Sequence, residues 1–321
     1  PDRGAVLCHR VASCRSSGAG AGSPVAVLTR MLFLTRPRPD IPPIVERRLA
    51  LRLWRHRGGR AGLVLGALLL LFALCGAVWT PHDADMPNYA NALKPPSLSH
   101  PFGTDATGRD MLSRVMDGAQ RSIGAAMLAL SAVFAIGLTL GILAALVGGL
   151  TDILIMRVVD IAMTMPPLVL GFAVLGLLGP GLYNLLLAVI IAEWAYYARL
   201  ARALSLDARH RPHVVAARLA GVPGWRIVSG HILPGVALHL GIVATLQIGV
   251  MISIISGFSF LGLGVQPPKA EWGALLAESR HIFSIAPRLL IAPAMAIFVS
   301  VLSANLLGNA LRDTVGPGAR P

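Results

Sequence analysis

The sequence is poor in charged residues and in cysteine, and both shortages narrow the class of protein. Charged residues make up 13% of the 321 residues, whereas apolar residues make up 55%. A soluble domain of this length could not bury so much apolar surface, so the composition is that of a polytopic membrane protein. The cysteines, Cys8, Cys14 and Cys75, form neither a disulfide framework nor a metal set, because two lie in a weakly patterned N-terminal tail and the third in an apolar segment.

Motifs of several enzyme classes are missing as well. The chain has no P-loop, so it does not supply an ATPase of that type, and it has no His-Glu-x-x-His zinc motif. It also has no Gly-x-Ser-x-Gly nucleophile elbow. A membrane-embedded hydrolase is the remote alternative, but the polar residues expected within the spans, Arg157, Asp160 and Glu193, form no Ser-His or paired-Asp arrangement. We therefore expect a protein that is not an enzyme and that holds no metal or cofactor of its own.

Acidic residues are few in comparison with basic ones, 15 against 28, which gives a net charge of +13. No basic stripe with interleaved aromatic residues is present, so the charge does not indicate a nucleic-acid partner. Much of it lies between residues 199 and 226 or just before the first apolar segment, at Arg47, Arg48, Arg52, Arg55, Arg57 and Arg60. The positive-inside rule places both basic segments in the cytoplasm.

Apolar segments predict an all-α protein with six transmembrane helices. A helix needs roughly 20 apolar residues to cross a bilayer, and the expected spans are residues 61–79, 122–147, 153–178, 182–201, 236–264 and 288–307. Residues 1–60 are expected to form a cytoplasmic segment, mostly disordered before a basic helix. Residues 80–121 are an expected external loop, 122–313 the core, and 314–321 a C-terminal tail. Residues 1–30 lack the features of a signal peptide, and Met31 is a candidate for the natural start.

Polar and small residues within the spans suggest specific contacts. Arg157 and Asp160 stand three residues apart on one helix face, so we expect them to pair and reduce the cost of charge near the bilayer. Glu193 is a lone carboxylate and a candidate for lining a translocation path, although the aromatic residues beside it equally fit an interfacial belt. Gly137 and Gly141 have the spacing that lets membrane helices approach closely.

A polar loop, residues 203–234, separates the fourth and fifth spans. Pro212 suits a first helical position and Gly221 suits the left-handed residue after a helix, so two short helices joined by a sharp turn are expected. Pro223 should open the second helix and Pro234 should close it. Helices this short are not stable alone, so the loop must pack against another element.

Three stretches resemble one family of membrane proteins. Ala216, Ala217, Gly221, Leu233 and Pro234 match the Ala-Ala, three residues, Gly, eleven residues, Leu-Pro core of the "EAA" loop of bacterial ABC-importer permeases. HPFGTDATGRD at residues 100–110 and SFLGLGVQPPKAEWG at residues 259–273 resemble the C-type subunit of dipeptide, oligopeptide and nickel importers. The resemblance implies the type I importer permease fold in the bacterial inner membrane, with both termini in the cytoplasm.

The resemblance also implies a role for the 203–234 loop, which in this family docks on the ATPase. The residues implied in ATPase coupling are Pro212, Val215, Ala216, Ala217, Gly221, Pro223, His231, Leu233 and Pro234. Val215 departs from the family pattern, because an acidic residue usually stands at that position and could make one more charged contact.

The same resemblance implies the partners and the cargo. The implied partners are a homologous B-type permease, two cytoplasmic ATP-binding subunits that carry ATP and Mg²⁺, an external substrate-binding protein or lipoprotein, and membrane lipid. The implied cargo is a dipeptide or oligopeptide, with nickel or another small solute as the alternative.

Overall fold

The computed structural model describes residues 48–315, so the expectations for residues 1–47 and 316–321 lie outside the described residues. Within residues 48–315 the regular secondary structure is helical, apart from one isolated bridge between Thr104 and Asp110. The elements are α3 (Arg48–Arg55), α4 (Arg57–Val78), a 3-10 turn (Tyr89–Asn91), α5 (Met111–Val147), α6 (Gly149–Thr164), α7 (Pro167–Leu178), α8 (Leu182–Arg209), α9 (Pro212–Leu219), α10 (Gly224–Ile227), a π-helical turn (Val228–Ile232), α11 (Leu233–Phe260), α12 (Trp272–Arg280) and α13 (Arg288–Val315).

Five helical segments are long and apolar enough to cross a membrane, and a sixth crossing results if α6 and α7 are counted as one bent span. This agrees with the six predicted crossings. Pro166 and Pro167 stand at a complete break in this bent span, because α6 ends at Thr164 and α7 begins at Pro167 at an angle of 90°. A proline cannot donate to the helical ladder and restricts the residue before it, so two in succession end the helix.

Several bounds differ from the prediction. α5 begins at Met111 rather than at residue 122, α8 continues to Arg209, and α13 continues to Val315. The ends of these helices are polar, so a search for apolar runs finds only the central part of each helix. Asp110 is the N-cap of α5, and its side chain accepts a hydrogen bond from the backbone N–H of Ser113 at 2.8 Å.

The small residues on α5 let α8 pack closely against it. A Cβ atom at Gly137 would lie 2.3 Å from the Cβ atom of Tyr197, and one at Gly141 would lie 2.5 Å from the carbonyl oxygen of Ala198. No side chain fits at such distances, so the Gly-x-x-x-Gly spacing is a packing motif here. Large apolar side chains on α4 are exposed, among them Leu68, Leu70 and Leu71. In a membrane protein such surface faces lipid or another subunit.

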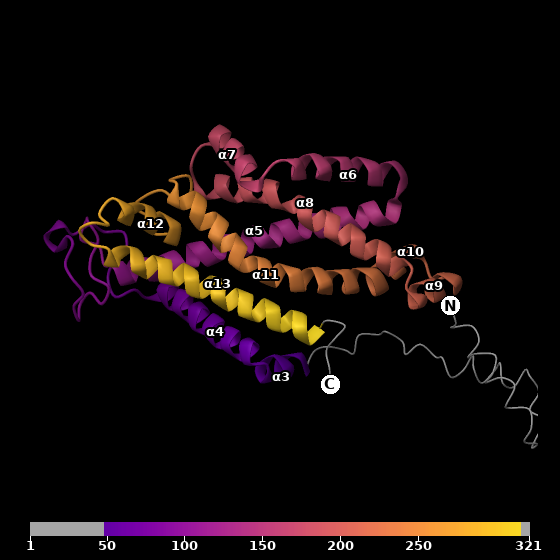
Figure 1. Cartoon of the computed structure of the whole chain (residues 1–321), viewed down its shortest axis with the longest axis horizontal. Helices are drawn as coiled ribbons and strands as arrows, with labels where there is room; N and C mark the ends of the chain where they lie inside the picture. Colours follow the sequence, from indigo (N-terminus) through magenta and orange to yellow (C-terminus); the bar gives the residue numbers. More distant parts are fainter. Residues whose placement is uncertain (1–47, 316–321) are drawn as a thin grey trace, which may run out of the picture. The chain divides into compact units, whose positions relative to one another are not determined.

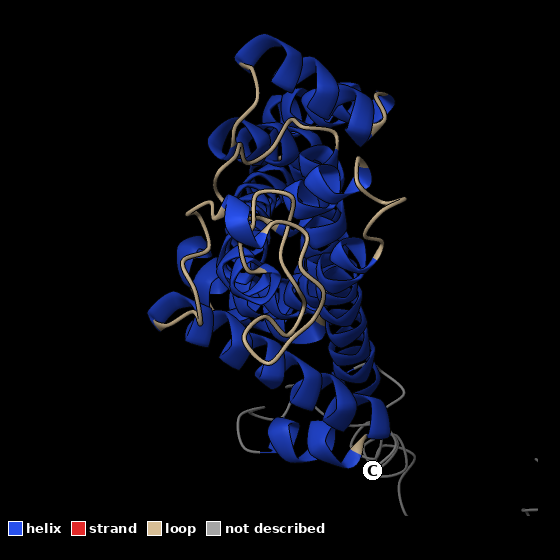
Figure 2. Cartoon of the chain, turned by 90° about the vertical axis from the view of Figure 1, so that its left-hand side faces the viewer, coloured by secondary structure: helices blue, strands red, loops and turns tan. Residues whose placement is uncertain are grey.

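The long helices have loops and short helices at both ends (Figure 1). At one end, here called the α9 end, α9 and α10 connect α8 to α11. At the other end, the α12 end, α12 lies near the loop of residues 79–110 (Figure 1), and Figure 2 looks onto this end, where the loops are drawn in tan. The two ends therefore present different surfaces, and each contains a polar cluster.

Candidate functional site

α9 is a short helix with defined boundaries at both ends. Pro212 occupies its first turn after the extended residue Arg211. Beyond its last residue, the N–H of Gly221 donates to the carbonyl of Arg218 and the N–H of Val222 donates to the carbonyl of Ala217, each at 3.1 Å. This pair of bonds is the Schellman motif, which requires a left-handed residue between helix and turn. Gly221 supplies it with a φ of 76°, as its position in the sequence predicted.

The second half of the 203–234 loop differs from the prediction. Pro234 does not close a helix, because α10, the π-helical turn and α11 form one continuous helical segment from Gly224 to Phe260. The π-helical turn ends directly before Leu233, and the N–H of Leu233 donates to the carbonyl of Val228. The wider π-helical turn leaves space for the ring of Pro234, and it does not need the backbone N–H that proline lacks. The loop is therefore rigidly continuous with α11.

Apolar and polar contacts fix α9 and α10 to the ends of the long helices. Val214, Ile227 and Ile232 are buried in the main apolar core. Arg209, at the end of α8, donates to the carbonyl of Ala145 in the last turn of α5 at 2.6 Å. The loop thus rests on a packed base.

An ion pair also joins the helices near this base. Arg202 on α8 donates to both carboxylate oxygens of Asp152 on α6, at 2.5 and 2.6 Å. A bidentate pair of this kind fixes the orientation of both side chains. α6 and α8 are therefore joined close to the α9 end.

The opposite face of the 203–234 loop is open. Leu219 is 84% exposed and Trp225 is 67% exposed, so two large apolar side chains are uncovered on this face. Arg218 and Arg226 are exposed beside them, and the guanidinium of Arg226 lies 5.1 Å from the centre of the Trp225 ring. A cavity of about 370 Å³ lies next to this face, lined by Leu146, Val147, Arg209, Arg218, Val222, Gly224, Ile227, Val228 and Ile232. An apolar and basic surface on a rigid base is suited to bind another protein.

The residues predicted for this loop divide between the two faces. The exposed ones are Pro212, Val215, Ala216, Gly221, Pro223, His231 and Pro234. Ala217 and Leu233 are half-buried against the core. The rings of His213 and His231 lie 6.0 Å apart, so the start of α9 and the π-helical turn meet.

Comparisons with known proteins identify this arrangement. Residues 137–321 match the family described as binding-protein-dependent transport system inner membrane component, and residues 47–96 match the N-terminal transmembrane domain of oligopeptide transport permease C. The chain belongs to the binding-protein-dependent transport permeases. It is the permease component of an ABC importer and a multi-span protein of the bacterial inner membrane.

Relatives of this permease are named for different substrates. The chain is 40% identical over 258 residues to the nickel transport system permease protein NikC of Escherichia coli (strain K12), covering 80% of this chain and 93% of the relative. It is 42% identical over 268 residues to the glutathione transport system permease protein GsiD of Escherichia coli O6:K15:H31, covering 83% and 88%. It is 33% identical over 292 residues to the dipeptide transport system permease protein DppC of Alkalihalophilus pseudofirmus, covering 88% and 96%.

The predicted pair within α6 of this permease is not formed. Asp160 instead accepts a hydrogen bond from Arg199 of α8 at 2.5 Å, while Arg157 is exposed. The spacing of Arg157 and Asp160 permits a pair, but the packing of α8 beside α6 brings a second arginine to the same carboxylate. Asp160 thus joins two helices, in the same way as Asp152.

Glu193 lies half-buried on α8, and it takes part in no hydrogen bond or ion pair among the described residues. Tyr197, one turn further along, is fully buried, and its hydroxyl has no hydrogen-bond partner within residues 48–315. A carboxyl group without a protein partner on a membrane helix is available to a solute or to a second subunit. Its role as part of a translocation path stays a prediction.

A buried ionic network at the α12 end was not anticipated from the sequence. Asp105 accepts hydrogen bonds from Nε of Arg109 at 2.7 Å and from Nη1 of Arg114 at 2.9 Å. Glu278 on α12 accepts from Nη2 of Arg109 at 2.9 Å and from both terminal nitrogens of Arg114. The side chain of Arg114 is 0% exposed, so its positive charge must be neutralised by these two carboxylates. The network joins α12 to the loop that precedes α5.

Burial raises the pKa of the Asp105 carboxyl, but the backbone hydrogen bond from Arg109 and the charges of Arg114 and Arg109 outweigh it and lower the pKa. Asp105 is therefore ionised and holds the network together at neutral pH. No local signal could have identified the network, because Glu278 lies 164 residues beyond Arg114 in the chain.

Proposed function

We propose that the 203–234 loop of this permease docks on separate ATP-binding subunits in the cytoplasm. The observation that carries the proposal is the exposed apolar and basic face of α9 and α10, held on the buried side chains of Val214, Ile227 and Ile232. A partner that covers Leu219 and Trp225 would remove large apolar side chains from water, which is favourable by roughly 1.5–3 kcal/mol for each fully buried side chain.

The base of the loop supports transmission of a movement into the membrane. α10 continues without a break into α11, and Arg202 and Arg209 connect α8 to α6 and α5. Rigid elements joined in this way move together when one of them is displaced. ATP binding by the partner subunits would shift the permease between two states, provided that the subunits bind those states with different affinities.

We propose dipeptides or oligopeptides as the cargo, passed to this permease by an external substrate-binding protein. The support is the match of residues 47–96 to oligopeptide transport permease C together with the dipeptide and glutathione relatives. Nickel is the second candidate, because the nickel permease relative is similar over a comparable share of the chain. The carrier complex would contain a homologous B-type permease, which would supply the other half of the path and cover part of the apolar surface.

Uptake measurements with the complete importer distinguish the two cargoes. Vesicles containing the permease and its partners are supplied with ATP and with radiolabelled dipeptide, oligopeptide, glutathione or ⁶³Ni²⁺. Peptide uptake without nickel uptake is expected. ATP-dependent nickel uptake without peptide uptake would overturn the proposed cargo and leave the docking proposal intact.

Cysteine labelling tests the orientation on which the docking proposal depends. In a variant lacking Cys8, Cys14 and Cys75, we expect Tyr89→Cys at the α12 end to react with a membrane-impermeant maleimide in intact cells. Leu219→Cys at the α9 end should react only after the membrane is opened, and it should cross-link to an ATP-binding subunit in the assembled complex. Reaction of Leu219→Cys from outside would refute the orientation and the docking together.

A further inference from the structure

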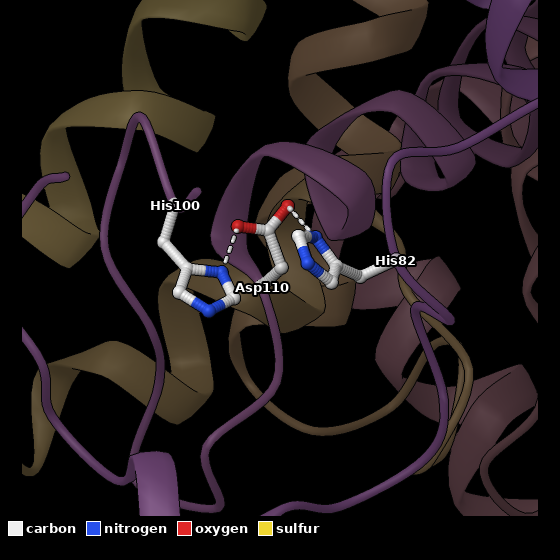
Figure 3. A group of neighbouring side chains, drawn as sticks. All are labelled: His82, His100 and Asp110. Carbon is white, nitrogen blue, oxygen red and sulfur yellow. Dashed lines mark hydrogen bonds and ion pairs between the residues drawn. The ribbon is translucent and has the colours of Figure 1, made fainter. Parts of the chain in front are cut away.

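We propose that His82, His100 and Asp110 bind a divalent transition-metal ion. The site lies at the α12 end, where the loop of residues 79–110 leads into α5. The ligand atoms of the three side chains lie within 4.8 Å of one another (Figure 3). They come from three separate places in the chain, two in the loop and one at the N-cap of α5. The proposal concerns a fixed ion that fastens the loop, and it holds whether the cargo is a peptide or nickel.

The separations are close to those of a metal site. Nδ1 of His100 lies 3.0 Å from Oδ1 of Asp110, and Nδ1 of His82 lies 3.9 Å from Oδ2 of Asp110. Two ligand atoms about 2.1 Å from a tetrahedral ion are about 3.4 Å apart. The two observed distances, each to a different oxygen of the Asp110 carboxylate, are one shorter and one longer than this. The side chain of His82 is 43% exposed, so packing does not enclose its ring on every side. A small movement of one surface side chain therefore completes the set.

The surrounding hydrogen bonds hold the carboxylate in place. Oδ2 of Asp110 accepts from the backbone N–H of Ser113 at 2.8 Å and from its hydroxyl at 2.7 Å. The same hydroxyl accepts from the backbone N–H of His82 at 3.0 Å, which brings the first histidine to the start of α5. Polar contacts that orient a ligand in this way raise metal affinity. Ser113 thus positions two of the three ligands.

The chemistry of the donors selects the class of ion. Two imidazoles and one carboxylate suit Zn²⁺, Ni²⁺, Co²⁺ and Cu²⁺, whereas Mg²⁺ and Ca²⁺ prefer sets made of oxygen. Neutral imidazoles and one carboxylate leave a net charge of −1, so a divalent ion is attracted. The side chain of Asp110 is fully buried and that of His100 is 12% exposed, so an ion enters past His82 and keeps water as its remaining ligand.

Metal titration of the full-length permease in lipid nanodiscs tests the site. The parent protein carries alanine at Cys8, His9 and Cys14, so that no thiol or imidazole of the N-terminal segment contributes to the titration, and it is stripped with chelator before Co²⁺ or Zn²⁺ is added. The variants are His82→Ala, which changes an exposed side chain, and His100→Ala. His281→Ala is the matched control, because His281 is an exposed histidine at the end of α12 outside the cluster.

We expect the parent and His281→Ala to bind one tight equivalent, with the visible absorption band of protein-bound Co²⁺ and a Zn²⁺-dependent rise in melting temperature. His82→Ala should weaken binding at least tenfold and abolish both signals, while its melting temperature without metal stays that of the parent. Mg²⁺ and Ca²⁺ should not compete.

Binding by His82→Ala with unchanged affinity would overturn the site, and so would a parent protein that binds no Co²⁺ or Zn²⁺. In either case the cluster is a hydrogen-bonded link alone. If His100→Ala does not fold, the comparison of His82→Ala with His281→Ala still decides the question.

Discussion

Gly221 offers the sharpest test of the docking loop, because within the chain its substitution perturbs the backbone conformation and no side-chain packing. A Cβ atom at this position would have no heavy atom within 4 Å, so a larger side chain meets no steric obstacle. The backbone has a φ of 76°, which costs an ordinary L-residue about 1–2 kcal/mol. That free energy corresponds to a shift of about 5- to 30-fold in the equilibrium between the observed turn and alternative conformations.

The assay compares ATP-driven uptake among Gly221→Val, Gly221→Ala and Gly221→Asn in the assembled importer. We expect uptake to fall about tenfold in the valine variant, less in alanine, and least in asparagine, because asparagine tolerates left-handed backbone best. Membrane insertion and expression should be unchanged in all three, because Gly221 is exposed and its Cβ contacts nothing.

Gly230→Ala is the matched control. Gly230 is exposed in the π-helical turn of the same loop and also has open space around its Cβ, but its φ is not positive. Its substitution should leave uptake unchanged. Uptake at the wild-type rate in Gly221→Val, with normal cross-linking from Leu219→Cys to the ATP-binding subunit, would refute the reasoning that the shape of this turn governs coupling.

Three further predictions concern stability and the path. Glu278→Ala should lower the free energy of unfolding by up to about 3 kcal/mol, because it removes one of the two carboxylates that pair with the buried Arg114. Lys269→Ala removes an exposed ion pair and should cost less than about 1 kcal/mol. Thermal melting in detergent compares the two variants. The lowered pKa of Asp105 contributes stability that is complete above its ordinary pKa of 3.8 and is lost as the pH falls through the lower folded-state pKa, so Asp105→Asn should flatten the acid side of the melting-temperature profile. Glu193→Gln should reduce uptake without changing the melting temperature, and unaltered uptake would remove Glu193 from the path.

Features that depend on neighbours along the chain were predicted from the sequence. The apolar spans follow from the requirement that backbone polar groups be satisfied within lipid. Gly221 as a left-handed residue after a helix follows from the backbone groups that a helix leaves unpaired at its end. Gly137 and Gly141 indicated a close helix contact, and α8 occupies it. Each of these signals lies within a few residues of the structure that it specifies.

The tertiary structure alone decided which charges meet and how the helices continue. Asp160 pairs with Arg199 and not with Arg157, and Glu278 completes a network with Arg114 that no local spacing indicates. The helix that contains Pro234 continues because a π-helical turn precedes it. A side chain pairs with the nearest suitable group in space, and the packing of distant helices determines which group that is.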